Sequence, residues 1–126
     1  MAKYVDGFVF VVPKNKVSEY KKMAKEGAAA WKKYGALQYF ETIGEDLVTK
    51  DVGGMKALEF TKMTKAKPNE TVWFSFIVFK SKKHRDAVNK KVMDAITKAM
   101  ENGKDMQMPF DMKRFVYGGF DVEVEG

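Results

Sequence analysis

The order of secondary-structure patterns constrains the fold of this chain more than any other feature of the sequence. Residues 4–12 are rich in aromatic and β-branched side chains, which is typical of a strand, and Pro13 ends it. Residues 16–34 carry an apolar stripe at spacings of three and four. This stripe predicts an amphipathic helix with Asn15 as its N-cap and Gly35 as its stop.

The second half of the chain repeats this order. Residues 36–43 read as a strand, 44–54 as a loop, and 55–63 as a short extension or edge strand. A strand over 71–79 follows, and then a helix that begins after a Ser81 cap and ends at Asn102-Gly103. The last strand covers residues 114–124. Strand–helix–strand therefore occurs twice, and we predict an α+β domain. Right-handed crossovers place both helices on one face of its sheet.

The alternation of side chains along residues 4–12 shows a sheet with two apolar faces. Tyr4, Asp6, Phe8 and Phe10 point to one face, and small or aliphatic residues such as Val5 point to the other. Because both helices cover a single face, we expect the aromatic face to lack cover from its own chain. A bare apolar face of that size is expected to meet a partner or a ligand.

Length and composition limit the class of protein. The 126 residues fit one domain, residues 1–126, and the chain has 0 cysteines and a net charge of +6. No basic-then-apolar leader and no apolar run of about 18 residues is present, so we expect a cytoplasmic protein with no membrane segment. The lysines are scattered over the polar face of the first helix, where a solvated surface explains them better than a nucleic-acid site.

Three segments of the sequence are distinctive: YVDGF at residues 4–8, FKSKKHRD at 79–86 and MPFDMKRFVYGGF at 108–120. Together they resemble the YbaA-like family of uncharacterised bacterial proteins. The resemblance implies a ferredoxin-like βαββαβ domain with an antiparallel sheet, which pairs sheet to sheet as a homodimer in the dimeric α/β-barrel arrangement. It implies no established activity. The wider superfamily includes cofactor-free monooxygenases, haem-degrading enzymes, lactone isomerases and small-molecule regulatory domains, so the fold does not choose among them.

Two residues are the candidates for chemistry. His84 is the one histidine and lies in the first turn of the second helix, where its ordinary pKa suits proton transfer. Asp6 interrupts the aromatic face of the first strand, and a carboxylate there needs a partner, for which Arg114 is the natural choice. A surface histidine and a structural salt bridge are the alternative interpretations.

Other side chains are candidates for binding. Arg85 and Arg114 suit an anionic group, while Tyr39, Glu41, Trp73 and Tyr117 suit the wall of a pocket for a flat organic ligand, together with Phe115. A purely structural core explains the same aromatic residues. Met106, Met108 and Met112 suit an adaptable lid or simple gap filling. We predict no metal site and no cofactor.

Three functions fit these features. The leading hypothesis is a homodimer that holds a small, partly apolar molecule between helices and sheet, with proton transfer or cofactor-independent oxidation as its enzymatic version. The second is a non-catalytic structural or ligand-binding dimer. The third is an RNA-binding module, since residues 74–79 approach an RNP1 pattern but lack its basic-Gly pair. We do not expect nucleic-acid binding, because Asp6 and Glu41 would place negative charge on the stacking surface.

Overall fold

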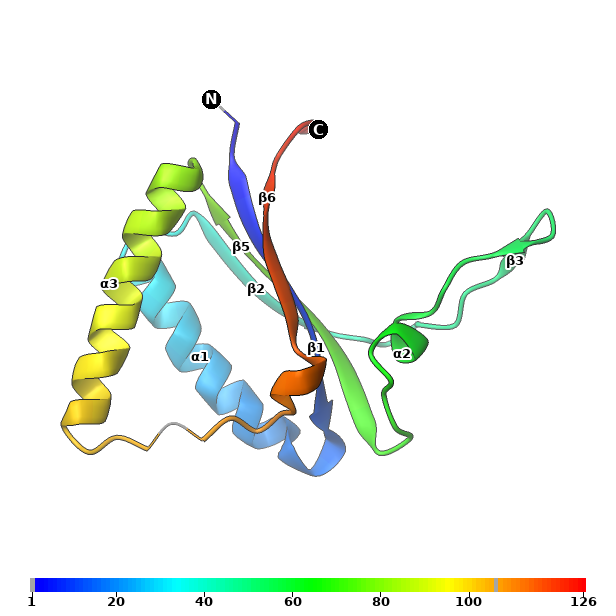
Figure 1. Ribbon diagram of the computed structural model, residues 1–126, viewed down its shortest axis with the longest axis horizontal. Coiled ribbons are helices and arrows are strands. Elements are labelled where there is room, and N and C mark those ends of the chain that lie inside the picture. The colour runs from blue at the N-terminus through cyan, green and yellow to red at the C-terminus, as the bar shows by residue number, and fades with distance from the viewer. Residues whose placement is uncertain (1, 106) are drawn as a thin grey trace.

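The computed structural model describes residues 2–105 and 107–126 (Figure 1). Its main elements are β1 (Tyr4–Pro13), α1 (Val17–Lys33), β2 (Gln38–Ile43), β5 (Glu70–Phe79), α3 (Lys82–Glu101) and β6 (Val116–Asp121). Its short elements are η1 (Lys14–Lys16), β3 (Asp51–Val52), β4 (Met55–Lys56), α2 (Phe60–Met63) and η2 (Met112–Arg114). None of the helices in the described part of the chain combines the length and the hydropathy needed to cross a bilayer.

The main strands form one sheet in the order β2-β5-β1-β6, and every neighbouring pair is antiparallel. Both long helices, α1 and α3, lie on the same face of this sheet (Figure 1). The predicted α+β class and the predicted single helical layer are confirmed. The strand order is consistent with a ferredoxin-like fold.

The core lies between the sheet and the helices in two clusters. In one, Phe79 of β5 packs with Val88 and Val92 of α3, and all three are fully buried or nearly so. In the other, Phe10 packs with Tyr20 of α1. The predicted stripe of α3 therefore faces the core at its N-terminal end.

The prediction of which sheet face is bare was wrong. The structure places Tyr4, Asp6 and Phe10 under the helices, where all three are buried. Large rings bury more apolar area than valine does, so the helices cover the aromatic side of β1. The uncovered side is the one that carries Phe74 of β5, which is 46% exposed, and Phe120 of β6, which is 61% exposed.

We call this side the open sheet face; it is exposed over most of its length, and Val11 and Val72 at one end of it are buried. By the strand register its members are Val5, Gly7, Val9, Val11, Pro13, Gln38, Phe40, Thr42, Glu70, Val72, Phe74, Phe76, Val78, Val116, Gly118 and Phe120. Glu70, at the start of β5, is the charged member of this set, and it is paired with Arg114 at 2.7 Å. Asp6 and Glu41 lie on the opposite, helix-covered face, so the charge argument used above against RNA binding does not hold.

The predicted helix boundaries agree with the structure except for the N-cap of α1. Ser81 caps α3 as predicted, because its hydroxyl accepts a hydrogen bond from the His84 backbone N–H at 3.1 Å. Gly35 follows α1 with a φ of 115°, a left-handed conformation that favours glycine. Asn15 does not cap α1. It lies within the 3-10 turn η1, and the N-cap position is Lys16, which has no side-chain capping bond.

Residues 44–59 form an arm that projects from the body. Figure 1 shows this arm on the side of the sheet away from α1 and α3. Its tip is the β3–β4 hairpin, whose turn places Gly53 and Gly54 at positive φ. Several apolar side chains of the arm are largely exposed: Val48, Val52, Met55 and Leu58. Residues 60–63 are helical, which corrects the predicted extension or edge strand.

Candidate functional site

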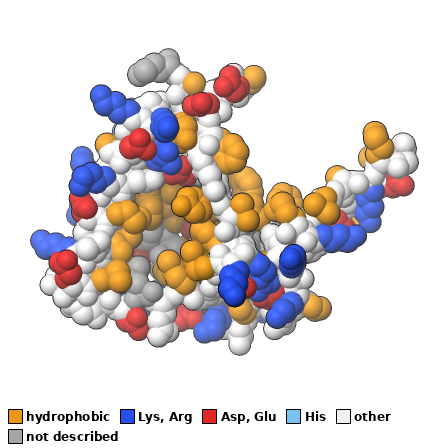
Figure 2. Space-filling view, in the orientation of Figure 1, with side chains coloured by type: hydrophobic (Ala, Val, Ile, Leu, Met, Phe, Trp, Pro, Cys, Tyr) orange, Lys and Arg blue, Asp and Glu red, His pale blue; other side chains and the backbone are white. Residues whose placement is uncertain are grey.

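A cavity of about 570 Å³ lies between α1, α3 and the sheet. The sheet contributes Phe8, Phe10 and Ile77, and the two helices contribute mainly methionine, alanine and aromatic side chains. Figure 2 shows hydrophobic side chains gathered around this hollow. The cavity is therefore a mainly apolar chamber that is partly open to solvent.

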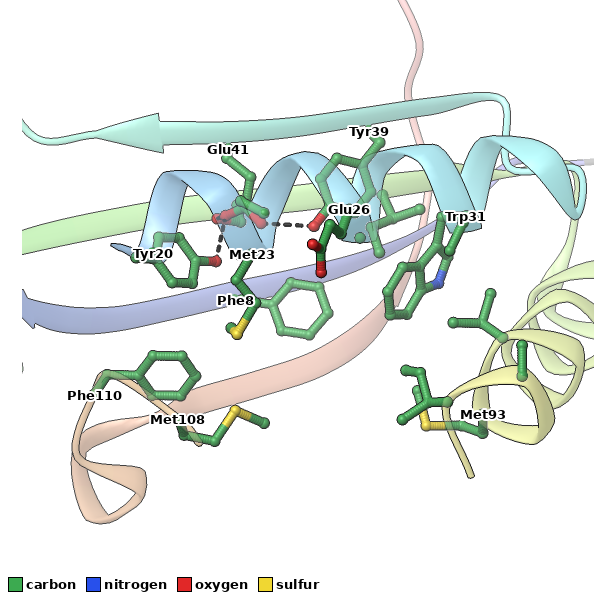
Figure 3. A pocket seen from close by; sticks show the side chains of 18 of the residues that line it. Phe8, Tyr20, Met23, Glu26, Trp31, Tyr39, Glu41, Met93, Met108 and Phe110 are labelled. Carbon is green, nitrogen blue, oxygen red and sulfur yellow. Dashed lines mark hydrogen bonds between the residues drawn. The ribbon is translucent and has the colours of Figure 1, made fainter. Parts of the chain in front are cut away.

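The cavity lies where α3 diverges from the sheet towards its C-terminal end (Figure 1). Along the stripe that faces the sheet, Val88 and Val92 are buried, whereas Ile96 and Ala99 are only half-buried. Met108 and Phe110, from the segment between α3 and β6, face the cavity from the other side (Figure 3). Flexible methionines at such positions can adapt to the shape of a guest.

A hydrogen-bonded cluster around Glu41 interrupts the apolar wall, and an exposed ion pair of Glu26 with Lys104 also lies in the lining. The Glu41 carboxylate of β2 accepts hydrogen bonds from the Tyr20 hydroxyl at 2.8 Å and from the Tyr39 hydroxyl at 2.6 Å (Figure 3). It also accepts one from the Ser75 hydroxyl of β5. These residues come from α1, β2 and β5, so only the folded chain assembles the cluster.

Burial and charge keep both tyrosines protonated. Burial raises the pKa of Tyr20 and of Tyr39 well above the usual value, and the negative charge of Glu41 raises both further. The two phenols therefore remain hydrogen-bond donors to Glu41. Tyr39 and Glu41 were predicted site residues, whereas sequence reasoning missed Tyr20 and Ser75. A hydroxyl on an apolar helix stripe and a serine inside a buried strand are the signals that point to them.

Asp6 and Arg85 form a salt bridge elsewhere. The Arg85 guanidinium donates to Asp6 at 2.9 Å and lies 4.9 Å from the centre of the Tyr4 ring. The Asn89 side chain donates to the second oxygen of Asp6 at 3.2 Å. None of these groups lines the cavity.

The predicted pairing of Asp6 with Arg114 is wrong. The strand register places Asp6 opposite Gly119, so Arg114 lies at the other end of β1. There Arg114 donates two hydrogen bonds of 2.7 Å to Glu70 and one of 3.0 Å to Asp111. Hydrogen bonds from Arg114 lower the pKa of Glu70 to about 2. Arg114 thus fastens η2 to the start of β5.

His84 is held by backbone contacts in the first turn of α3. Its Nδ1 accepts a hydrogen bond from the Lys80 backbone N–H at 3.0 Å, and its ring meets the edge of Phe79. The ring lies outside the cavity lining. The structure therefore places His84 and Asp6 apart from the cavity, beside the same end of α3.

The predicted aromatic wall divides between core and cavity. Phe115 lines the cavity, whereas Trp73 is a core residue at 3% exposure. Tyr117 stacks on Phe8 at a ring separation of 6.0 Å and lies outside the lining itself.

The predicted methionine lid divides in a similar way. Met108 lines the cavity and Met112 does not, while Met106 lies outside the described residues. Over residues 2–105 and 107–126, no three His, Cys, Asp or Glu side chains are grouped so as to hold a metal ion.

Comparisons with known proteins place the chain in a family. The model of the family described as "Protein of unknown function (DUF1428)" matches residues 3–112. The uncharacterized protein YbaA of Escherichia coli (strain K12) is 43% identical over 123 residues, which cover 98% of each chain, and YbaA of Shigella flexneri matches equally.

A solved structure, of a Bacillus cereus protein related to NIF3, covers 100% of this chain at 16% identity and a TM-score of 0.34. The match spans only 28% of that longer chain. The predicted family resemblance is confirmed by the sequence matches. The chain belongs to the DUF1428 family of YbaA-like uncharacterised proteins.

Proposed function

We propose that this protein binds a small, mainly apolar molecule in the cavity between α1, α3 and the sheet. The observation that supports this most strongly is the combination of about 570 Å³ of mainly apolar space with the hydrogen-bonded Glu41 cluster in its wall. Ligand sites commonly have this volume and this composition, in which a few polar groups orient a mostly apolar guest.

Packing energetics support a role for the cavity. Protein interiors are close-packed, and an apolar space of this size forfeits contacts that a better-packed core would make. Water gains few hydrogen-bond partners from walls made of Phe8, Ile77 and Met93. An apolar guest would restore the missing contacts.

Binding without a reaction is the version that the geometry favours. His84 and Asp6 are each engaged in contacts that stabilise the start of α3, at a distance from the cavity lining. If the protein catalyses proton transfer, Glu41 is the group placed to accept the proton, because its carboxylate lies in the cavity wall. Arg85 and Arg114 are both paired with carboxylates, so neither is positioned to hold an anionic ligand there.

A cavity-filling variant tests the proposal. N-phenylnaphthylamine, a neutral apolar dye that fluoresces in apolar surroundings, should bind the wild-type protein. Ala99→Trp, which places an indole in the cavity wall, should weaken its binding by at least about tenfold. Ala87→Trp on the exposed face of the same helix is the matched control and should bind the dye normally. Equal dye binding by both variants would refute the cavity as the site.

We further propose that the open sheet face packs against a second copy of the chain. Its strand residues include exposed Phe40, Phe74 and Phe120, and its one charged member, Glu70, is paired with Arg114 at one end of the face. This composition suits an apolar partner surface and offers no unpaired strand cation to nucleic-acid phosphates. The arm projects on the same side of the sheet and carries exposed Val52 and Met55 (Figure 1). A second copy seated on the open face would cover both.

A further inference from the structure

The Glu41 carboxylate is the unbalanced charge of the cavity. Three charged residues line it, and two of them, Glu26 and Lys104, pair with each other at 3.1 Å. Glu41 is half-buried, and no Lys or Arg nitrogen of the described residues lies within salt-bridge distance of it. A partly desolvated carboxylate that lacks a cation is poised to receive one.

Hydrogen-bond counting leaves room for a ligand at this carboxylate. A carboxylate offers about four acceptor positions, and Glu41 uses three. Oε1 accepts from Tyr20 and Ser75, while Oε2 accepts from Tyr39 alone. One position on Oε2 is open to a further donor. Since the hydroxyls act as donors, they hold Glu41 ready as an acceptor.

We propose that the molecule bound in the cavity carries a protonated amine, whose ammonium group donates to Glu41 while its apolar body fills the chamber. This inference rests on the proposed function and names the chemical class of its ligand. The aromatic rings of Tyr20, Tyr39 and Trp31 lie around the same wall, and their faces attract a cation. An anionic ligand would be repelled by Glu41.

Two lysines of α1 line a second depression together with Glu41. Lys21 and Lys25 flank a shallower depression of about 280 Å³ that shares Tyr39 and Glu41 with the cavity. Both lysines are exposed, and neither forms an ion pair with Glu41. Because both lysines are solvated and unpaired with Glu41, they offset its charge only weakly.

The test compares three ligands with the same body. Phenylbutylamine, phenylbutanol and phenylbutyrate differ only in a cationic, neutral or anionic end group, and each is titrated calorimetrically into the wild-type protein. The amine should bind at least about tenfold more tightly than the alcohol and more tightly still than the carboxylate. The overall charge of +6 favours anions at long range, so a preference for the cation must come from the local site.

Two variants assign the preference to Glu41. Glu41→Gln keeps the shape of the side chain but removes its charge, and it should lower the affinity for phenylbutylamine to the affinity for phenylbutanol. Glu26→Gln, in the same wall but paired with Lys104, should keep the preference. If Glu41→Gln does not fold, the comparison of the three ligands in the wild-type protein still tests whether the cavity prefers a cationic ligand.

The outcomes separate the two proposals. Equal binding of all three ligands, tighter binding of the alcohol or the carboxylate, or an amine preference that survives Glu41→Gln would overturn the amine inference and leave cavity binding intact. If neither these three ligands nor N-phenylnaphthylamine bind the protein, both the amine inference and the proposed cavity binding are overturned.

Discussion

The salt bridge between Asp6 and Arg85 predicts that removing Arg85 destabilises the protein more than neutralising Asp6 does. The Asp6 side chain is 6% exposed and that of Arg85 is 20% exposed. Arg85→Met removes the guanidinium but keeps the aliphatic stem, and leaves Asp6 with only the Asn89 bond of 3.2 Å. Breaking a buried ion pair from one side costs about 3–5 kcal/mol. We expect about 3 kcal/mol here, because Arg85 is partly solvated.

The opposite change should cost less. Asp6→Asn leaves Arg85 with Asp86, which it contacts at 2.8 Å, and with solvent. The loss is then closer to one charge-assisted hydrogen bond, about 1.5–2 kcal/mol. The double variant should lose less than the sum of the two, because the contact is already absent after the first change.

Urea denaturation of the three variants against the wild type measures these differences. Lys90→Met is the matched control on α3, since its pair with Asp94 is exposed on both sides and should contribute less than about 0.5 kcal/mol. A loss from Asp6→Asn that equals or exceeds the loss from Arg85→Met would refute the reasoning. Asp6 would then have a role beyond the salt bridge.

Three further predictions concern other parts of the molecule. Arg114 holds the pKa of Glu70 at about 2, below its ordinary 4.5, so this pair stabilises the fold fully above pH 4.5 and its contribution is lost as the pH falls towards 2. Acid unfolding followed by circular dichroism should therefore show less loss of stability between pH 4.5 and 2 for Glu70→Gln than for the wild type. Identical acid-unfolding profiles for the two proteins would contradict this prediction. His84→Ala should lower stability by about 1 kcal/mol in thermal unfolding, through loss of the bond from Lys80, and should leave dye binding unchanged. Light scattering should give twice the chain mass of 14.4 kDa for the wild type and a single chain for Phe74→Lys, whereas a monomeric wild type at micromolar concentration would rule out the proposed dimer.

The sequence predicts the element order well because each signal is local. The stripe of α3, the Ser81 cap and Gly35 at the end of α1 each depend on residues within a few positions. Which face of the sheet the helices cover is not a local property. Alternation gives the sheet two apolar faces, one carrying Phe10 of β1 and the other carrying Phe74 of β5. Only the packing of both helices determines that the face with Phe10 is buried and the face with Phe74 is left exposed.

The site is harder to predict than the fold. Tyr39 was predicted as an aromatic side chain that suits a pocket wall, and Glu41 as a carboxylate on the apolar face of its strand. Tyr20 and Ser75 reach the same carboxylate from positions 21 and 34 residues away in the chain. The partner of Asp6 was wrong for the same reason: Arg85 is 79 residues distant, and its approach depends on how α3 crosses the sheet.

The most direct test of cavity binding uses the methionines as reporters. With methyl-labelled methionine, NMR titration with N-phenylnaphthylamine should shift the signals of the methionines that line the cavity. These are Met23, Met93, Met100 and Met108. The signals of Met63 and Met112, which lie outside the lining, should stay in place. Shifts confined to Met63 and Met112, or no shift at saturating dye, would contradict the account.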